Sequence, residues 1–303
     1  MYRTIENKEN SIRLGIDIGG TNIKFAVIDE GKVLATSSIK TAKTCDGMMQ
    51  DISREYERLS EIHTITTVGV GVPGIMKDGL LTAVNLPFHE TPLKKLIEEK
   101  IGLPVTIDND ANCAALGEVL FGDVQDCNNI VLVTLGTGVG GGIIMNRRIC
   151  NGKAGMGEIG HIVIQAEDGL PCPCGLAGCW EQYASATALL RQATKAAESA
   201  PDSILYQMYV SAGNALNGEA VFSAMEQGCP VAKQVFDKYL SYLAVGIRSL
   251  VNIFAPDAII LAGGITRQGD KLLQPLRIKL PDSVRVEIST LQNDAGALGA
   301  AML

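Results

Sequence analysis

Three cysteines and one histidine lie close together in this sequence and constrain the local fold more than any other feature. The segment from Gly155 to Glu181 contains His161, followed by Cys172, Cys174 and Cys179. Three thiolates and one imidazole form a complete tetrahedral set of zinc ligands, with no coordination position left open. A closed site of this kind fixes the backbone and performs no Lewis-acid chemistry. The spacing therefore predicts a structural zinc ion.

Two alternatives explain clustered cysteines without a metal. They could form a disulfide, or they could be buried thiols, since free cysteine is among the most buried residue types. Cys172 and Cys174 are too close along the chain for an easy disulfide with each other, and the glycines, prolines and upstream histidine favour metal. Such a site would also hold two carboxylates, Glu158 and Glu181, which indicates an adjacent pocket for a polar ligand.

The composition indicates a globular protein of two domains. With 303 residues, the chain exceeds the size at which single cores usually divide. Hydrophobic residues make up 47% and charged residues 19%, which is too apolar for disorder. The net charge of −7 argues against a nucleic-acid-binding surface. It does not exclude an anionic ligand, because backbone amides can bind phosphate without lysine.

Targeting signals are not evident in the sequence. The opening M-Y-R-T-I-E-N-K-E-N lacks the apolar core of a signal peptide, and no run approaches the ~18 apolar residues of a membrane span. The 8 cysteines then fit reduced thiols, some of them metal ligands. We therefore expect a cytoplasmic protein with no membrane partner.

The pattern of apolar residues predicts an α/β fold that begins with an antiparallel meander. Three strands are expected at 12–18, 23–28 and 33–39, joined by tight turns. Further strands are expected from residues 67, 105, 130, 140, 257 and 284, and helices at 47–59, 92–100, 111–120, 185–197, 218–227, 230–254, 269–279 and 295–302. The strand, Gly/Thr turn and second strand of residues 14–25 recur at 132–143, which indicates two domains of related topology.

Three glycine clusters follow predicted strands and are candidates for phosphate binding. Such turns expose backbone amides to a ligand, although glycines also serve hairpins that need a positive φ. No helix directly follows the G-T-G-V-G-G run, so a dinucleotide site is not indicated, and no P-loop motif occurs. The three clusters could converge on one nucleotide; they contain Gly19, Gly20 and Thr21, then Thr137 and Gly138, then Gly263 and Gly264.

Polar residues at two strand ends are candidates for the chemistry. Asp17 could order Mg²⁺ through water between ATP oxygens or could be an ordinary turn residue, and Lys24 is more simply solvated than bound to phosphate. Asp110 is placed to be the N-cap of the next helix. It could also be a general base at the carboxyl end of a strand, where ligands collect in α/β folds. The neighbouring Asn109 could exchange hydrogen bonds with a ligand hydroxyl.

Five motifs together resemble one family. L-G-I-D-I-G-G-T-N-I-K-F, D-N-D-A-N, L-G-T-G-V-G-G-G, G-E-I-G-H and C-P-C-G-L-A-G-C-W-E occur in this order and resemble the ROK family of sugar kinases and repressors, closely its bacterial glucokinases. The resemblance runs from about Leu14 to the last helix. Small departures are Trp180, where the glucokinases usually carry an aliphatic residue, and Ala262-Gly263-Gly264 in place of three glycines.

The resemblance implies an actin-like ATPase fold of the ribonuclease H type, with two α/β domains and a cleft between them. The expected domains are 1–118 with 290–303, and 119–289, which carries the zinc site. Asp110 would be the catalytic base, and the zinc ligands would be His161, Cys172, Cys174 and Cys179. The ATP contacts would be Asp17, Lys24 and the three glycine clusters. The expected sugar contacts are Gly74, Asn85, Asn109, Asp110, Glu158, His161 and Glu181.

The implied activity is ATP-dependent phosphorylation of a hexose, with Mg²⁺ and a structural Zn²⁺. Glucose is the expected substrate, with fructose, mannose, allose or an N-acetylhexosamine as alternatives. A sugar-responsive repressor is the competing class, but only about a dozen residues precede the first strand, too few for a helix-turn-helix domain. The family also implies a homo-oligomer, either a dimer or a tetramer.

Overall fold

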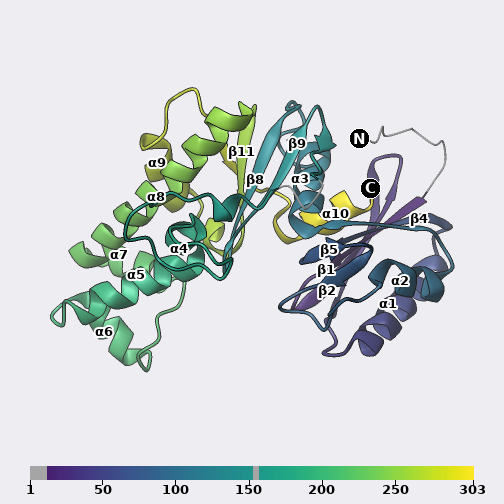
Figure 1. Ribbon diagram of the computed structural model, residues 1–303, viewed down its shortest axis with the longest axis horizontal. Coiled ribbons are helices and arrows are strands. Elements are labelled where there is room, and N and C mark those ends of the chain that lie inside the picture. The colour runs from purple at the N-terminus through teal and green to yellow at the C-terminus, as the bar shows by residue number, and fades with distance from the viewer. Residues whose placement is uncertain (1–11, 153–156) are drawn as a thin grey trace. The chain divides into compact units, whose positions relative to one another are not determined.

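The computed structural model describes residues 12–152 and 157–303 (Figure 1). The chain divides into two compact units, each built from separate segments of the sequence. The first unit comprises Met1–Leu132, Gly142–Gly157 and Thr290–Leu303, and the second comprises Val133–Gly141 and Glu158–Ser289. Residues 119–132 and 142–157 therefore belong to the unit of the N-terminal sheet, whereas the predicted boundaries placed them in the second domain. The domain boundaries stay a prediction.

The first unit is built on a sheet with the strand order β3-β2-β1-β4-β7. Strand β1 pairs antiparallel with β2, which pairs antiparallel with β3, while β4 runs parallel to both β1 and β7. The strands are β1 (Ile12–Ile18), β2 (Asn22–Asp29), β3 (Lys32–Lys40), β4 (Ile65–Val72) and β7 (Val105–Asn109). The antiparallel meander followed by parallel strands confirms the expected α/β class and its actin-like arrangement.

Side-chain size along β1 separates the two faces of this sheet, because successive residues point to opposite sides. Leu14 and Ile16 are fully buried in a core shared with α1 (Cys45–Ser60) and α2 (Leu93–Ile101). On the other face Gly15 allows close approach of α10 (Ala295–Ala300), since a Cβ at Gly15 would stand 1.9 Å from the Ala297 carbonyl oxygen. Helix α3 (Asp110–Phe121) packs against α10 in the same layer.

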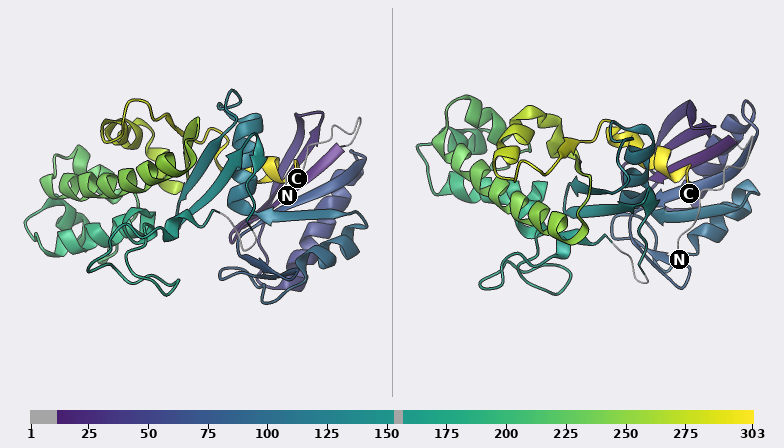
Figure 2. Two further views of the ribbon diagram at one scale, coloured as in Figure 1. Left: turned by 45° about the horizontal axis from the view of Figure 1, so that its top comes forward. Right: turned by 90° about the horizontal axis from the view of Figure 1, so that it is seen from above.

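The second sheet has the order β10-β9-β8-β11-β12 among the described residues. These strands are β8 (Ile130–Leu135), β9 (Val139–Met145), β10 (Arg148–Ile149), β11 (Ala258–Ala262) and β12 (Val286–Ile288). The helices of the second unit are α4 (Glu181–Ala184), α5 (Ala186–Glu198), α6 (Ile204–Ser211), α7 (Ala220–Glu226), α8 (Pro230–Phe254) and α9 (Asp270–Ile278), seen from other sides in Figure 2.

The long helix α8 supports the segment that follows the cysteines. Trp180 is fully buried and its indole Nε1 donates a hydrogen bond to the Tyr242 carbonyl oxygen at 2.9 Å. The ring lies against Gly246, where an added Cβ would stand 2.0 Å from the indole. The unusual tryptophan is therefore accommodated by a glycine on α8.

Most expected elements are present, with ends that differ by a few residues. The final helix ends at Ala300 instead of Met302, and the strand expected at 284–288 begins at Val286. The sequence pattern did not predict α4, α6, the strand β10, or the small hairpin of β5 (Ile75–Lys77) and β6 (Leu80–Thr82). Within the described part of the chain, no helix has the length and apolar character needed to cross a membrane.

Candidate active site

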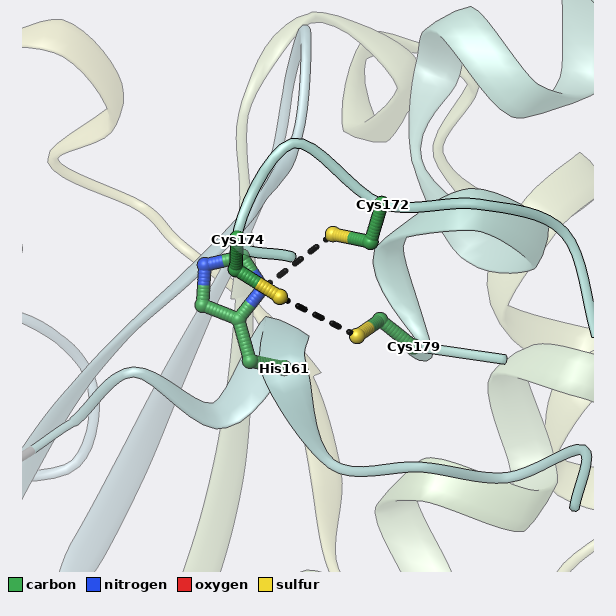
Figure 3. Close-up of side chains that lie close together, drawn as sticks. All are labelled: His161, Cys172, Cys174 and Cys179. Carbon is green, nitrogen blue, oxygen red and sulfur yellow. Dashed lines mark hydrogen bonds between the residues drawn. The ribbon is translucent and has the colours of Figure 1, made fainter. Parts of the chain in front are cut away.

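The four predicted zinc ligands lie together in the second unit. One ligand atom from each of His161, Cys172, Cys174 and Cys179 lies within 4.8 Å of every other (Figure 3). The Sγ atoms of Cys174 and Cys179 are 3.6 Å apart, and Cys172 Sγ is 3.5 Å from His161 Nδ1. A tetrahedral zinc ion with Zn–S bonds of about 2.3 Å separates its sulfur ligands by about 3.8 Å. The donor set and its spacing therefore fit zinc.

Tight local turns bring these ligands together from an irregular segment. His161 ends a short 3₁₀ helix, η1 (Ile159–His161), and isolated bridges pair Val163 with Cys179 and Pro171 with Ala177. Gly178 has a φ of 82°, and a Cβ there would stand 1.9 Å from the Gln165 carbonyl oxygen. This glycine is therefore required for the turn that presents Cys179.

The cluster needs a cation if its buried thiols are to ionise. Burial raises the pKa of Cys172 to about 12 and raises the pKa of Cys179. Zinc binds thiolates, so its binding would reverse both shifts and release protons. The protein residues thus supply a pre-assembled ligand set whose charge the metal would balance.

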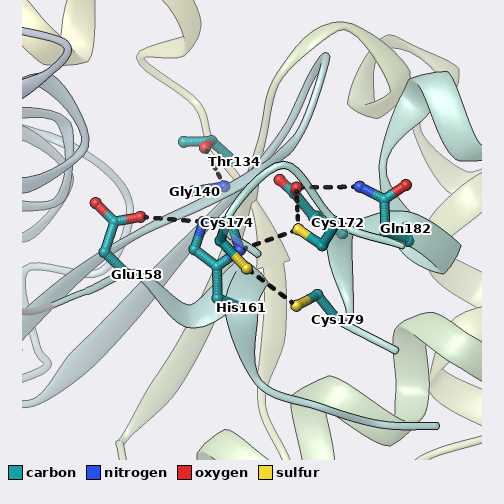
Figure 4. A network of polar contacts seen from close by, with 9 residues as sticks. Thr134, Gly140, Glu158, His161, Cys172, Cys174, Cys179 and Gln182 are labelled. Carbon is teal, nitrogen blue, oxygen red and sulfur yellow. Dashed lines mark hydrogen bonds and ion pairs between the residues drawn. The ribbon is translucent and has the colours of Figure 1, made fainter. Parts of the chain in front are cut away.

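The two predicted carboxylates adjoin different members of the cluster: Glu158 lies beside His161 (Figure 4), and Glu181 lies beside Cys172. Glu158 Oε2 is 3.9 Å from His161 Nε2, while the Nδ1 atom of the same ring faces Cys172. Cys172 Sγ lies 3.2 Å from Glu181 Oε1, which also accepts a hydrogen bond from Gln182 Nε2 at 3.2 Å. His161 thus offers Nδ1 to a metal and Nε2 to the side where Glu158 lies.

Two of the three glycine clusters meet within the second unit. Gly263 has a φ of 103°, and a Cβ there would stand 2.4 Å from the carbonyl oxygen of Leu135, which directly precedes the Gly136-Thr137-Gly138 turn. Gly136 and Thr137 are exposed, as are Gly263 and Gly264. Two adjacent backbone turns with four exposed residues therefore present amides that can bind phosphate oxygens.

Asp17, among the predicted site residues of the first unit, has a strongly raised pKa. Burial, and then the charges of Asp110 and Asp294, raise the pKa of Asp17 to about 7, although Lys24 acts in the opposite direction. Lys24 is not simply solvated as expected, because its Nζ donates to Asp294 Oδ1 at 2.9 Å and to the Asn293 carbonyl oxygen at 2.8 Å. The site therefore collects negative charge that a cation would stabilise.

The expectation that Asp110 caps α3 is wrong. Asn109 has an extended backbone with φ −65° and ψ 144°, and its Oδ1 accepts from the backbone N–H groups of Ala111 at 2.9 Å and Asn112 at 3.4 Å. Asn109 is therefore the N-cap, and Asp110 is the first helical residue, accepting from Ala111 N at 3.0 Å. With its oxygen engaged, Asn109 retains its amide N–H groups as donors to a ligand.

The remaining predicted contacts of the first unit surround the first glycine turn. Gly19 N donates to the Asn22 carbonyl oxygen at 3.0 Å, and Thr41 Oγ1 donates to the Gly19 carbonyl oxygen at 2.6 Å. Gly20 and Thr21 are exposed, and a Cβ at Gly20 would stand 3.7 Å from the Asn85 carbonyl oxygen.

Gly74 begins the next loop at a φ of 125°, where a Cβ would stand 2.5 Å from the Thr82 carbonyl oxygen. A side chain there would be strained as well as obstructed. Asn85 is exposed and follows the same hairpin, so both predicted sugar contacts belong to the loop region after β4.

Sequence reasoning missed several residues that support these groups. Gln182 donates to Glu181 and, through Oε1, accepts from Arg191 Nη1 at 3.4 Å. Asp108 accepts hydrogen bonds from Asn109 N and Asn112 Nδ2 at the start of α3. Asp108 and Asn112 both belong to the D-N-D-A-N motif, so their place beside Asp110 in the sequence could have indicated that they support it. Gly155 and Met156, at the start of the predicted zinc segment, lie outside the described residues.

Comparison with known proteins places the chain among sugar kinases and regulators. A profile of the ROK family matches residues 13–303. The glucokinase of Streptomyces coelicolor is 36% identical, covering 96% of this chain and 97% of that protein. A ROK family glucokinase from Streptomyces griseus, solved in complex with glucose and AMPPNP, is 36% identical with a TM-score of 0.78, over 96% of this chain and 98% of that chain. A putative xylose repressor from Caldicellulosiruptor is 32% identical, over 98% of this chain and 79% of its own length.

Proposed function

The chain belongs to the ROK family, and we propose that it is an ATP-dependent hexokinase that converts glucose to glucose 6-phosphate. Curated glucokinases are 33–37% identical over nearly the full length of the chain. The observation that carries the proposal is the position of Asp110, whose carboxylate is fixed at the junction of β7 and α3 beside the capping Asn109. This junction is the carboxyl end of a strand, where α/β folds bind ligands.

Asp110 is the proposed general base. Its carboxylate would accept the proton of the primary hydroxyl of the sugar as that oxygen forms a bond to the γ-phosphorus of ATP. The bond from this phosphorus to the bridging oxygen breaks, and ADP leaves with the bonding electrons. Phosphoryl transfer depends mostly on positioning and charge stabilisation, so the groups required of the protein are one well-placed base, amide donors and a carboxylate for Mg²⁺.

The glycine turns are the proposed phosphate contacts. Thr137 and Gly138 lie beside Gly263 in the second unit, and Gly19, Gly20 and Thr21 form the corresponding turn of the first unit. Mg²⁺ bound with ATP would neutralise phosphate charge, and Asp17 is the carboxylate suited to hold it through water. The raised pKa of Asp17 supports this role, because a group that resists ionisation alone gains most from a nearby cation.

The zinc cluster is proposed to orient sugar contacts. A zinc ion bound by His161, Cys172, Cys174 and Cys179 would supply structural cross-linking without catalysis, since the four ligands fill its coordination shell. The chain would then hold Glu158, His161 Nε2 and Glu181 as acceptors and donors for sugar hydroxyls. Gly74, Asn85 and Asn109 are the proposed contacts from the first unit.

Other hexoses and a regulatory role are the alternatives to glucose phosphorylation. Fructose, mannose, allose and N-acetylhexosamines differ from glucose at one or two ring positions, so a related hexose is the main alternative substrate. A sugar-responsive repressor is the second candidate function, favoured by the 32% identity to a putative xylose repressor. We also propose that the protein is a homo-oligomer, either a dimer or a tetramer, and light scattering would measure its molar mass in solution.

The test is a steady-state assay of the purified protein with each hexose, ATP and Mg²⁺. We expect glucose to give the highest kcat/KM, with ADP and glucose 6-phosphate formed in equal amounts. Another preferred hexose would change the substrate but retain the kinase. No phosphorylation of any hexose, together with salt-resistant binding to operator DNA, would favour the repressor.

A further inference from the structure

Three polar side chains of the first unit form a closed network beside Asp110. The carboxylate of Asp108 accepts three hydrogen bonds: from Asn109 N at 2.7 Å and Asn112 Nδ2 at 2.8 Å, both on Oδ1, and from Asn151 Nδ2 at 2.9 Å on Oδ2. Asn112 Nδ2 also donates to Asn151 Oδ1 at 3.2 Å. Every pair among Asp108, Asn112 and Asn151 is therefore joined directly.

This network fixes the backbone on both sides of Asp110. Asp108 holds the peptide N–H of Asn109, which precedes Asp110, and it holds the side chain of Asn112, which follows two residues later. Asn109 in turn caps the same helix turn. The position of Asp110 thus depends on Asp108, and the position of Asp108 depends on its asparagine partners.

Asn112 is oriented in a way that does not serve stability alone. Its side chain is buried, with 3% exposure, and its Oδ1 has no hydrogen-bond partner among the described residues. A buried acceptor without a partner opposes folding. The opposite amide orientation would turn Oδ1 toward the Asp108 carboxylate, where two acceptors repel. The Asn112 amide is therefore oriented so that Nδ2 donates to Asp108, although this leaves Oδ1 without a hydrogen bond.

Asn151 reaches the network from a distant part of the sequence. It is exposed and lies just after β10, in the segment that connects this strand to Glu158. Its side chain is hydrogen-bonded to Asp108 and Asn112 at the β7–α3 junction, and neither of these two bonds involves Asp110 directly. Loss of this side chain should therefore loosen the junction without unfolding the unit.

We propose that Asn112 and Asn151 are positioning residues that hold Asp110 in reach of the sugar hydroxyl through Asp108. This inference rests on the proposed function, in which Asp110 is the base. A displacement of about 1 Å at a reacting group can lower a rate by about 100-fold. Loss of one anchor should lower kcat by about 10- to 100-fold, while KM for ATP stays within about threefold of the wild-type value.

The first experiment compares Asn151→Ala with Asn129→Ala, a matched loss of an asparagine. Asn129 Oδ1 accepts a hydrogen bond from Asn146 N at 2.9 Å at the β9–β10 turn of the same unit, and the three hydrogen bonds of the Asp108 carboxylate described above do not involve it. Asn151→Ala should show the fall in kcat and Asn129→Ala should not, with both folded by circular dichroism. Equal kcat in the two variants would overturn the inference. An inactive wild-type protein would instead reject the proposed function.

The second experiment exchanges the two partners. Asp108→Asn alone sets two amide NH₂ groups against each other, and Asn151→Asp alone sets two carboxylates against each other. In the double variant Asp108→Asn/Asn151→Asp, every donor again faces an acceptor, and Asn112 can still donate to both. We expect each single variant to lose at least about tenfold in kcat and the double variant to recover most of it. A double variant that regains its melting temperature without regaining kcat would also overturn the inference.

Discussion

The carboxylate of Glu181 lies against the backbone of Gly138. A Cβ added to Gly138 would stand 2.5 Å from Glu181 Oε2, and the other carboxylate oxygen, Oε1, receives the hydrogen bond of Gln182. Both residues belong to the second unit. A glycine of the proposed nucleotide turn thus leaves the space that a proposed sugar-binding carboxylate occupies.

The contact predicts a selective effect of Gly138→Ala. The obstructing atom is the end of a flexible side chain, so the methyl group should displace the carboxylate at little cost in folding free energy. We expect KM for the sugar to rise several-fold, with a melting temperature near that of the wild-type protein. Gly136→Ala is the control, because a Cβ there meets nothing within 4 Å. An unchanged sugar KM in Gly138→Ala would show that Glu181 does not need this position.

Asp17 should make the stability of the ligand-free protein depend on pH. Its pKa is about 7 in the folded protein against an ordinary value of 3.8, so the folded state holds a proton that the unfolded chain has lost between these values. The unfolding free energy contributed by this group therefore falls as pH rises from about 4 to 7. At about 1.4 kcal/mol for each pKa unit, the loss at pH 8 is on the order of 4 kcal/mol.

Asp17→Asn tests this dependence. The variant should be more stable than the wild-type protein at pH 8 and similar to it near pH 4, as measured by urea unfolding without metal or nucleotide. Asp123→Asn is the control, since that carboxylate is exposed, belongs to the same unit and is not among the charges that shift the pKa of Asp17. If Asp17→Asn keeps the wild-type slope between pH 4 and 7, the group does not titrate there.

Local patterns allowed most of the fold to be predicted from the sequence. The meander follows from apolar runs separated by short turns, and α8 was predicted with its observed bounds because Pro230 marks its start and its apolar spacing continues to Phe254. The cluster of His161 with Cys172, Cys174 and Cys179 was predictable because the spacing of these residues is short and thiols with an imidazole form a typical metal-ligand set. The β5–β6 hairpin lacked such a signal, since its residues Ile75 and Met76 are apolar but exposed.

Features that depend on one backbone angle or on distant pairing were not predictable. Asn109 and Asp110 are both good helix caps, and only the extended ψ of Asn109 decides between them. Asn151 is hydrogen-bonded to Asp108 although the two are 43 residues apart in the sequence, and no short motif predicts this contact. The same holds for Gly138 and Glu181, which lie on different elements. Residue types were enough to predict which side chains could bind or react, whereas the residues that position them could be identified only from the fold.

Removal of zinc should affect both stability and sugar binding. We expect one zinc per chain in freshly purified protein, and Cys174→Ser should lose it because the serine hydroxyl is a poor zinc ligand. The variant should melt at a lower temperature and show a higher KM for the sugar, since Glu158 and Glu181 adjoin the cluster. Cys45→Ser, outside the cluster, should keep its zinc. Wild-type protein without zinc, or unchanged sugar KM after chelation, would contradict this prediction.

Asp110 provides the sharpest test of the proposed base, because helix capping and catalysis belong to adjacent residues. Asp110→Asn and Asp110→Ala both leave the Asn109 cap in place, so both should remain folded with melting temperatures near the wild-type value. Neither side chain can accept the hydroxyl proton, so kcat should fall by about 10²- to 10⁴-fold. Asn109→Ala removes the cap and should lose about 1 kcal/mol of unfolding free energy. Asn109→Asp is the matched control, since aspartate caps equally well and retains stability while removing an amide donor to the sugar. Turnover of Asp110→Asn within a few-fold of the wild-type rate would assign the base to another group.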